Sequence, residues 1–205
     1  MEGDVEILKV KSDNDINVES IISEKKKIIE GLNNNKKTPC DGCPKLQFKK
    51  WTNIEKIKIN KISIEAHSKC NARCSYCSEM FYGGLNPNYD LNKMLSKFKK
   101  LNFFDKNVAI TWGGGEPVLL KNFKNIFKNF IDSKYPKFQD IRVYSNSIIY
   151  SELIHKYLDQ NKIILTTSTD AGTQETYQKV RGVKKGFLKI FENLKKYNTK
   201  KNGNI

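Results

Sequence analysis

The chain has 205 residues and a mass of 23.7 kDa, which suffices for one domain with a hydrophobic core and is short for two. Its 38% hydrophobic and 11% aromatic content excludes a disordered chain. Because no apolar run is long enough for a membrane span or a signal peptide, we expect a cytoplasmic protein. A net charge of +15 would suit an anionic partner such as nucleic acid, but only three of the 37 basic residues are Arg, so we favour a Lys-rich solvated surface.

The first part of the chain is predicted to be a helical extension. Apolar residues keep a helical period from Val18 to Leu32, and Asn17 is a suitable N-cap. The loop that follows carries Cys40 and Cys43. Alternating isoleucines in residues 57–64 then indicate a strand.

The rest of the chain alternates between strands and helices. Further strands are predicted at 108–112, 141–145 and 162–168, and helices at 91–101, 119–130, 153–158 and 187–197. Four successive strand–helix units indicate an α/β protein with a parallel sheet. We therefore expect an N-terminal extension in residues 1–56 and a main domain in residues 57–205.

The five cysteines all lie between Cys40 and Cys77, and their odd number does not suit a disulfide framework. Cys70, Cys74 and Cys77 form a C-x3-C-x2-C pattern. Thiolates are the ligands of iron–sulfur clusters, and a loop with these gaps can bring three sulfurs to one [4Fe–4S] cluster. Three protein ligands leave the fourth iron open to another molecule.

The role of Cys40 and Cys43 stays open from the sequence. The pair could help to hold an auxiliary cluster or a zinc ion, act as a redox pair, or have a structural role. An alternative function, a basic zinc-ribbon protein that binds nucleic acid, would pair them with Cys74 and Cys77. The gap between the two pairs is longer than the roughly 15–20 residues typical of such sites, and this reading leaves Cys70 unexplained.

A second motif, Gly-Gly-Gly-Glu-Pro at residues 113–117, follows the strand predicted at 108–112. It lacks the GK[ST] of a phosphate-binding P-loop, and its carboxylate would repel phosphate. Glycines allow a ligand to approach the backbone closely, and a Glu beside them suits a ligand ammonium group. Alone, the motif is also explained as a glycine-rich turn at the end of a strand.

Together, CNARCSYC and the strand that ends in GGGEP resemble the radical S-adenosylmethionine (radical SAM) enzymes. The resemblance runs through most of residues 57–205 and implies a partial (β/α) barrel, with a [4Fe–4S] cluster held by Cys70, Cys74 and Cys77. The family's partial barrel has six units, so we expect this chain, with about four, to be the N-terminal part of such a core. The segment 168–182 is also similar to members with a C-terminal auxiliary-cluster domain of the SPASM or twitch type.

The same resemblance implies contacts to S-adenosylmethionine (SAM). Tyr76 would lie beside the adenine, the GGE motif would bind the methionine ammonium, and polar residues after the later strands would contact the ribose and the methionine end. These candidates are Tyr76, Gly113, Gly114, Gly115, Glu116, Ser145, Asn146, Ser168, Asp170 and Arg181, the last of them facing the SAM carboxylate. Packing explains Tyr76 equally well, and turn or cap roles explain Ser145, Asn146 and Asp170. We interpret His67 and His155 as a polar loop residue and a surface helix residue.

The activity that the resemblance implies is reductive cleavage of SAM to a 5′-deoxyadenosyl radical, which abstracts hydrogen from a substrate that the sequence does not identify. The cofactor carries this chemistry, and the protein orients it. The expected partners are an electron donor such as flavodoxin or ferredoxin and a substrate with peptides and proteins among the candidates. We expect neither a membrane nor a nucleic acid as a partner.

Overall fold

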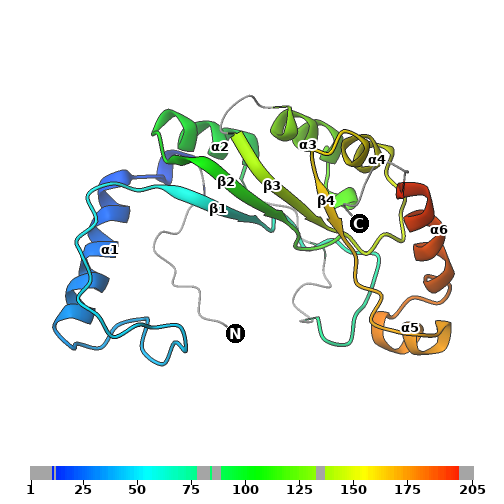
Figure 1. The fold of residues 1–205 in the computed structure, drawn as a ribbon, viewed down its shortest axis with the longest axis horizontal. Helices are drawn as coiled ribbons and strands as arrows, with labels where there is room; N and C mark the ends of the chain where they lie inside the picture. Colours follow the sequence, from blue (N-terminus) through cyan, green and yellow to red (C-terminus); the bar gives the residue numbers. More distant parts are fainter. Residues whose placement is uncertain (1–10, 12, 78–83, 85–88, 133–136, 199–205) are drawn as a thin grey trace. The chain divides into compact units, whose positions relative to one another are not determined.

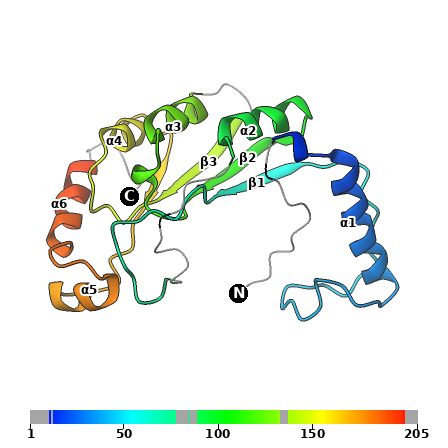
Figure 2. The same cartoon turned by 180° about the vertical axis from the view of Figure 1, so that it is seen from behind.

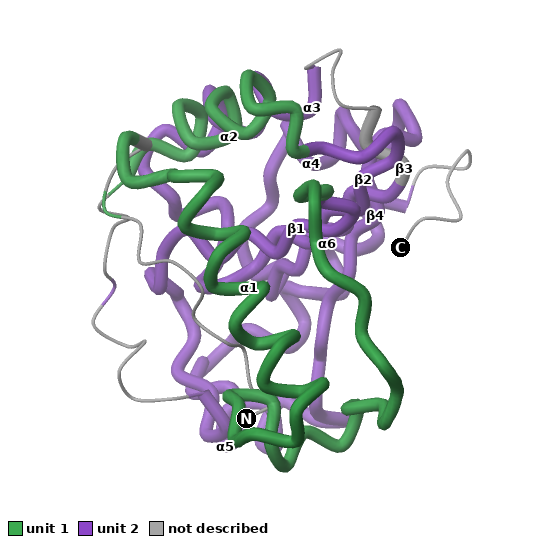
Figure 3. Tube along the Cα trace, turned by 90° about the vertical axis from the view of Figure 1, so that its left-hand side faces the viewer, with its two compact units in different colours: residues 1–58, 88–103 green, residues 59–87, 104–205 purple. Residues whose placement is uncertain are grey.

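The chain forms two compact units, which are coloured separately in Figure 3. The structure is a computed structural model that describes residues 11, 13–77, 84, 89–132 and 137–198. Unit 1 comprises residues 1–58 and 88–103, and unit 2 comprises residues 59–87 and 104–205. The domain boundary predicted after residue 56 stays a prediction.

Unit 1 contains the helix predicted near the N-terminus. A 3-10 turn, η1 (Asp13–Asp15), precedes α1 (Val18–Asn33), whose N-cap Asn17 accepts a hydrogen bond from the Ser20 N–H at 3.1 Å. The unit also contains α2 (Leu91–Lys100). Both helices begin at the residues that their sequence patterns indicated, because Asn and Asp side chains satisfy first-turn N–H groups that have no partner within the helix.

The described residues of unit 2 form a four-stranded sheet with the order β1-β2-β3-β4 (Figure 1). The strands are β1 (Ile59–Ile64), β2 (Phe104–Trp112), β3 (Lys137–Tyr144) and β4 (Ile164–Thr166), and each neighbouring pair is parallel. The predicted α/β class and parallel sheet are therefore confirmed. Because the strands are parallel, their carboxyl ends lie at one edge of the sheet.

Two helices of unit 2, α3 (Phe123–Ile131) and α4 (Glu152–Asp159), lie on the same side of the sheet in both views (Figures 1 and 2). Aromatic side chains join them to β2. Trp112 is fully buried and contacts Phe127 of α3 with 5.1 Å between ring centroids, and Phe127 contacts Tyr157 of α4 at 5.8 Å. This packing fixes the end of β2, directly before GGGEP.

A smaller core joins the end of β3 to the last two helices, α5 (Gln174–Arg181) and α6 (Phe187–Tyr197). It consists of Ile148, Tyr177 and Ile190. The Asn193 side chain of α6 donates hydrogen bonds to the carbonyl oxygens of Ser147 and Ile148 at 2.9 and 3.0 Å. The helix α6 therefore contacts and holds both the segment after β3 and the helix α5.

Among the described residues, no helix has both the length and the apolar character that a membrane crossing requires. A short 3-10 turn, η3 (Pro117–Leu119), follows the GGGEP glutamate.

Candidate functional site

A cavity of about 550 Å³ opens among the loops that follow the carboxyl ends of the four strands of unit 2. Most of the residues that the sequence marked as candidates line it: Cys70, Cys74, Tyr76, Cys77, Gly114, Gly115, Glu116, Ser145, Asn146, Ser168 and Arg181. Gly113 and Asp170 belong to the same unit but do not line the cavity. Residues widely separated in the sequence thus share one site, where parallel α/β folds place their ligands.

The three thiols of the C-x3-C-x2-C pattern line this cavity with different exposure: Cys74 is buried, Cys70 is half-buried and Cys77 is exposed. All five cysteines are described, and none forms a disulfide. Within the described ranges, no group of three or more His, Cys, Asp or Glu side chains is arranged to hold a metal ion. A [4Fe–4S] cluster takes each thiolate on a different iron, and three thiols that line one cavity fit this requirement.

The GGGEP turn holds the start of the loop that carries the thiols. The Gly115 N–H donates to the His67 carbonyl oxygen at 2.8 Å, and the Glu116 N–H donates to the Lys69 carbonyl oxygen at 2.7 Å. A Cβ on Gly115 would lie 2.2 Å from that Lys69 oxygen, and Gly114 has a φ of +90°. From the sequence we expected these glycines to allow the close approach of a ligand; in the structure they allow the close approach of the cysteine loop itself.

The end of α5 holds the middle of the same loop. The Arg73 N–H donates to the Arg181 carbonyl oxygen at 2.9 Å, and the Ser75 N–H donates to the Val180 carbonyl oxygen at 2.8 Å. Cys74 lies between these two hydrogen bonds. The position of this thiol therefore depends on a helix more than a hundred residues later in the chain.

The Glu116 carboxylate is almost completely buried, with an exposed fraction of 1%. One oxygen accepts a hydrogen bond from the Ser145 hydroxyl at 2.8 Å, and the other accepts one from the Asn146 N–H at 2.7 Å. Burial raises the pKa of Glu116, and these donated hydrogen bonds offset part of the rise. A carboxylate has about four lone-pair sites, so this one can still accept from a ligand.

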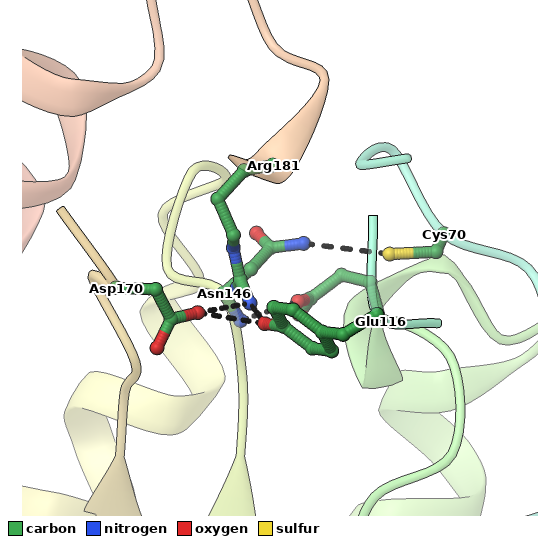
Figure 4. Close-up of polar contacts among 6 residues, drawn as sticks. Cys70, Glu116, Asn146, Asp170 and Arg181 are labelled. Carbon is green, nitrogen blue, oxygen red and sulfur yellow. Dashed lines mark hydrogen bonds and ion pairs between the residues drawn. The ribbon is translucent and has the colours of Figure 1, made fainter. Parts of the chain in front are cut away.

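The Asn146 side chain links the end of β3 to the cysteine loop (Figure 4). Its Oδ1 accepts a hydrogen bond from the Ile148 N–H at 3.0 Å, which fixes the orientation of the amide. Its Nδ2 therefore faces the loop, where it donates to Asn71 Oδ1 at 2.7 Å and to Cys70 Sγ at 3.7 Å.

Tyr76, Asp170 and Arg181 bond to one another, and Figure 4 shows the contact between Arg181 and Asp170. The Tyr76 hydroxyl donates to Asp170 Oδ2 at 2.6 Å, and Arg181 Nη1 donates to the same oxygen at 2.9 Å and to the Tyr76 hydroxyl. Arg181 is buried, and its Nε has no hydrogen-bond partner in the described part of the chain. These three residues, which the resemblance assigned to different parts of SAM, thus form one hydrogen-bonded group. The Arg181 Nε has no acceptor within this group.

His67 also belongs to this site, although we interpreted it from the sequence as a polar loop residue. It is buried, with an exposed fraction of 6%, and it lines the cavity. Its Nδ1 accepts a hydrogen bond from the Lys69 N–H at 3.1 Å. Burial, reinforced by the Lys69 ammonium, lowers the pKa of His67 below its usual value of 6.5. Its place directly after a predicted strand was the signal that could have identified it.

The lowered pKa of His67 predicts a loss of stability in mild acid. The unfolded chain takes up a proton near pH 6.5, whereas the folded chain resists it, so the stabilisation is complete above pH 6.5 and is lost as the pH falls toward the folded-state pKa. Between pH 7 and 5.5 the free energy of unfolding should fall by at most about 1.4 kcal/mol per pH unit. Urea unfolding of His67→Gln should show a flatter pH dependence, with His155→Gln as the matched control. An unchanged dependence in His67→Gln would contradict the prediction.

The other two cysteines lie in a turn of unit 1. The Cys43 N–H donates to the Cys40 carbonyl oxygen at 3.1 Å, and the Cys40 N–H donates to Thr38 Oγ1 at 3.2 Å. The Thr38 hydroxyl in turn donates to Asp41 Oδ1 at 2.9 Å. Cys40 is half-buried and Cys43 is exposed, so the turn presents at least one thiol to solvent.

Comparison with known proteins gives a family for most of the chain. The family model of the radical SAM superfamily matches residues 64–204. A probable GTP 3′,8-cyclase of Methanocaldococcus jannaschii is 28% identical over 125 residues, which are 60% of this chain and 40% of the relative. A cysteine-type anaerobic sulfatase-maturating enzyme of Clostridium novyi is 33% identical over 147 residues, which cover 63% of this chain and 38% of the relative.

The fold is similar to that of a solved structure described as hexahistidine-tagged anSMEcpe with bound AdoMet. The TM-score is 0.52 at 21% identity, and the match covers 68% of this chain and 41% of the other. The chain therefore spans less than half the length of the curated relatives described above.

Proposed function

The chain belongs to the radical SAM superfamily, and we propose that its unit 2 binds a [4Fe–4S] cluster and SAM in the cavity at the strand ends and serves hydrogen abstraction from a substrate. Enzymes of this family use both cofactors. The reduced cluster, held by Cys70, Cys74 and Cys77, would supply the one electron for the cleavage of SAM to methionine and a 5′-deoxyadenosyl radical, and this radical would take a hydrogen atom from the substrate. The family membership confirms the resemblance seen in the sequence and gives no support to the zinc-ribbon alternative.

One observation carries the proposal: the three thiols and the GGGEP glutamate line the same cavity. Cys70, Cys74 and Cys77 would hold the cluster. The loop on which they lie is fixed from both sides by backbone hydrogen bonds, so its shape does not depend on the cofactor alone. A fixed loop lowers the entropy cost of gathering three ligands.

Glu116 would bind the SAM ammonium group. Its two oxygens already accept hydrogen bonds from Ser145 and Asn146. These bonds orient the carboxylate and leave lone pairs that can accept from a ligand. Gly113, Gly114 and Gly115 would form the turn that presents this carboxylate. In a buried site an ammonium would also relieve the cost of burying the Glu116 charge.

The cluster formed by Tyr76, Asp170 and Arg181 would face other parts of SAM. The Arg181 guanidinium lines the cavity and is a donor group of the kind that a carboxylate accepts. The Tyr76 ring is 63% exposed, so it offers a face on which an adenine can stack. Ser145, Asn146 and Ser168 complete the set of polar candidates in the cavity, and Asp170 would act from beside it.

The substrate and partners belong to the same proposal. The sulfatase-maturating relative, at 33% identity, supports a peptide or protein substrate. The relative named as a GTP 3′,8-cyclase, at 28% identity, supports a nucleotide as the alternative substrate. An electron donor of the flavodoxin or ferredoxin type would reduce the cluster, in a cytoplasmic setting. The role of Cys40 and Cys43 stays open, with an auxiliary metal, a redox pair and a structural role as the alternatives.

The proposed function is tested by SAM cleavage. Protein reconstituted without oxygen with iron and sulfide, then given SAM and dithionite, should form 5′-deoxyadenosine, measured by chromatography. Glu116→Gln should keep the iron but bind SAM more weakly in calorimetry, since a charge-assisted hydrogen bond contributes roughly 1.5–3 kcal/mol. Colourless protein with stoichiometric zinc would contradict the proposal and favour the zinc-ribbon alternative.

A further inference from the structure

The sulfur of Cys70 accepts two N–H hydrogen bonds in the described part of the chain. The Ala72 N–H donates from within the cysteine loop at 3.4 Å. Asn146 Nδ2 donates from the end of β3 at 3.7 Å (Figure 4). Both distances suit a sulfur acceptor, whose radius exceeds that of oxygen. The second bond joins Cys70 to a residue 76 positions away in the sequence.

The Asn146 donor is held firmly toward this sulfur. The side chain is buried, with an exposed fraction of 6%. The Ile148 N–H occupies its Oδ1, and its own backbone N–H donates to Glu116. An amide nitrogen has two hydrogens, so one can serve Asn71 Oδ1 while the other serves Cys70 Sγ. A flip of the amide would place its oxygen toward the sulfur and leave the Ile148 N–H facing a donor.

We propose that Asn146 is a positioning residue that raises the reduction potential of the cluster by donating an N–H···S hydrogen bond to Cys70. This inference rests on the proposed function, because it requires Cys70 to be a cluster ligand. One-electron reduction adds negative charge that is shared by the irons and their sulfurs. A donor directed at a ligand sulfur stabilises the more negative state, and hydrogen bonds to sulfur are among the factors that set cluster potentials.

The position of Asn146 gives the bond a second consequence. The same residue holds Glu116 through its backbone and Cys70 through its side chain. Asn146 therefore connects Glu116, the candidate SAM ligand, directly to Cys70, the candidate cluster ligand. A displacement of the β3 end would alter both contacts together, which links the geometry of SAM binding to the potential of the cluster.

The test is a redox titration with dithionite of the reconstituted protein, followed by the electron paramagnetic resonance signal of the reduced cluster. Asn146→Ala should shift the midpoint potential downward, and Asn146→Gln, which retains an amide donor, should recover part of the shift. Ser147→Ala is the matched control, because Ser147 lies at the same strand end but its hydroxyl bonds to the Thr167 hydroxyl and donates nothing to sulfur. Its potential should equal that of the unchanged protein.

An unchanged potential in Asn146→Ala would overturn the inference, as would an equal shift in Ser147→Ala. If Asn146→Ala takes up no iron, Asn146→Leu fills a similar volume without a donor and gives the same comparison. Loss of iron in both, with iron retained in Ser147→Ala, would mean that Asn146 is needed for assembly and not for tuning. Failure of the unchanged protein to take up iron would count against the proposed function instead.

Discussion

Replacing Cys70, Cys74 and Cys77 together by Ala should remove the iron and the brown colour from protein reconstituted without oxygen. The unchanged protein should bind about four irons, because a [4Fe–4S] cluster needs thiolate ligands and these three line one cavity. The loss should be complete, since the variant keeps none of the three thiols that line this cavity. Iron and sulfide analysis and the visible absorption spectrum measure the result.

The matched control is the double variant Cys40→Ala with Cys43→Ala. It removes two thiols from unit 1 and leaves the cavity of unit 2 untouched. Retention of about four irons would show that the cluster does not need this pair. An unchanged protein that binds clearly more than about four irons, with the excess lost in the double variant, would instead support an auxiliary cluster at this pair. A triple variant that kept its iron would contradict the assignment of the cluster ligands.

The sheet could be predicted from the sequence because its strands are short apolar runs separated by helical periods. The first and last residues of the strands were harder to predict. β2 begins at Phe104, four residues before the predicted start, because Asp105, Lys106 and Asn107 are exposed and break the apolar pattern. β4 is shorter than predicted, since only Ile164–Thr166 pair with β3.

The helix α5 was missed entirely, although its boundaries carry ordinary signals. Thr173 caps its first turn by accepting from the Thr176 N–H at 3.2 Å, and Gly182 ends it with a φ of +66°. The helix itself shows no apolar stripe, because its buried residues are Tyr177 and Arg181. The spacing of apolar residues does not reveal a helix whose buried face carries a charged residue. In α5 that residue is Arg181, which lines the candidate site.

The candidate site was predictable as a set of residues but not as a network. The rule that parallel strands present their carboxyl ends at one edge was enough to gather Glu116, Asn146 and the cysteine loop. It could not indicate that Asn146 donates to Cys70, because that contact depends on the orientation of one amide. It could have indicated His67, which follows the strand predicted at 57–64, although the residue type alone does not distinguish it from an ordinary polar loop residue.

Gly115→Ala should destabilise the fold and reduce the uptake of iron. The new Cβ would lie 2.2 Å from the Lys69 carbonyl oxygen and 2.8 Å from the Lys69 nitrogen, both of them backbone atoms. Relief requires the turn or the cysteine loop to move, which would break the hydrogen bonds from Gly115 to His67 and from Glu116 to Lys69. Two hydrogen bonds and the steric clash together should lower the free energy of unfolding by roughly 2–5 kcal/mol.

Gly172→Ala is the matched control for this change. A Cβ at Gly172 meets nothing within 4 Å, and its φ is not in the left-handed region. The same substitution there should leave the fold unchanged or stabilise it by up to about 1 kcal/mol, because Ala restricts the unfolded chain. Urea unfolding measures both variants, and iron content after reconstitution shows whether the cysteine loop has moved, because Cys70 directly follows Lys69. Equal stability and equal iron in the two variants would mean that GGGEP does not position the cysteine loop.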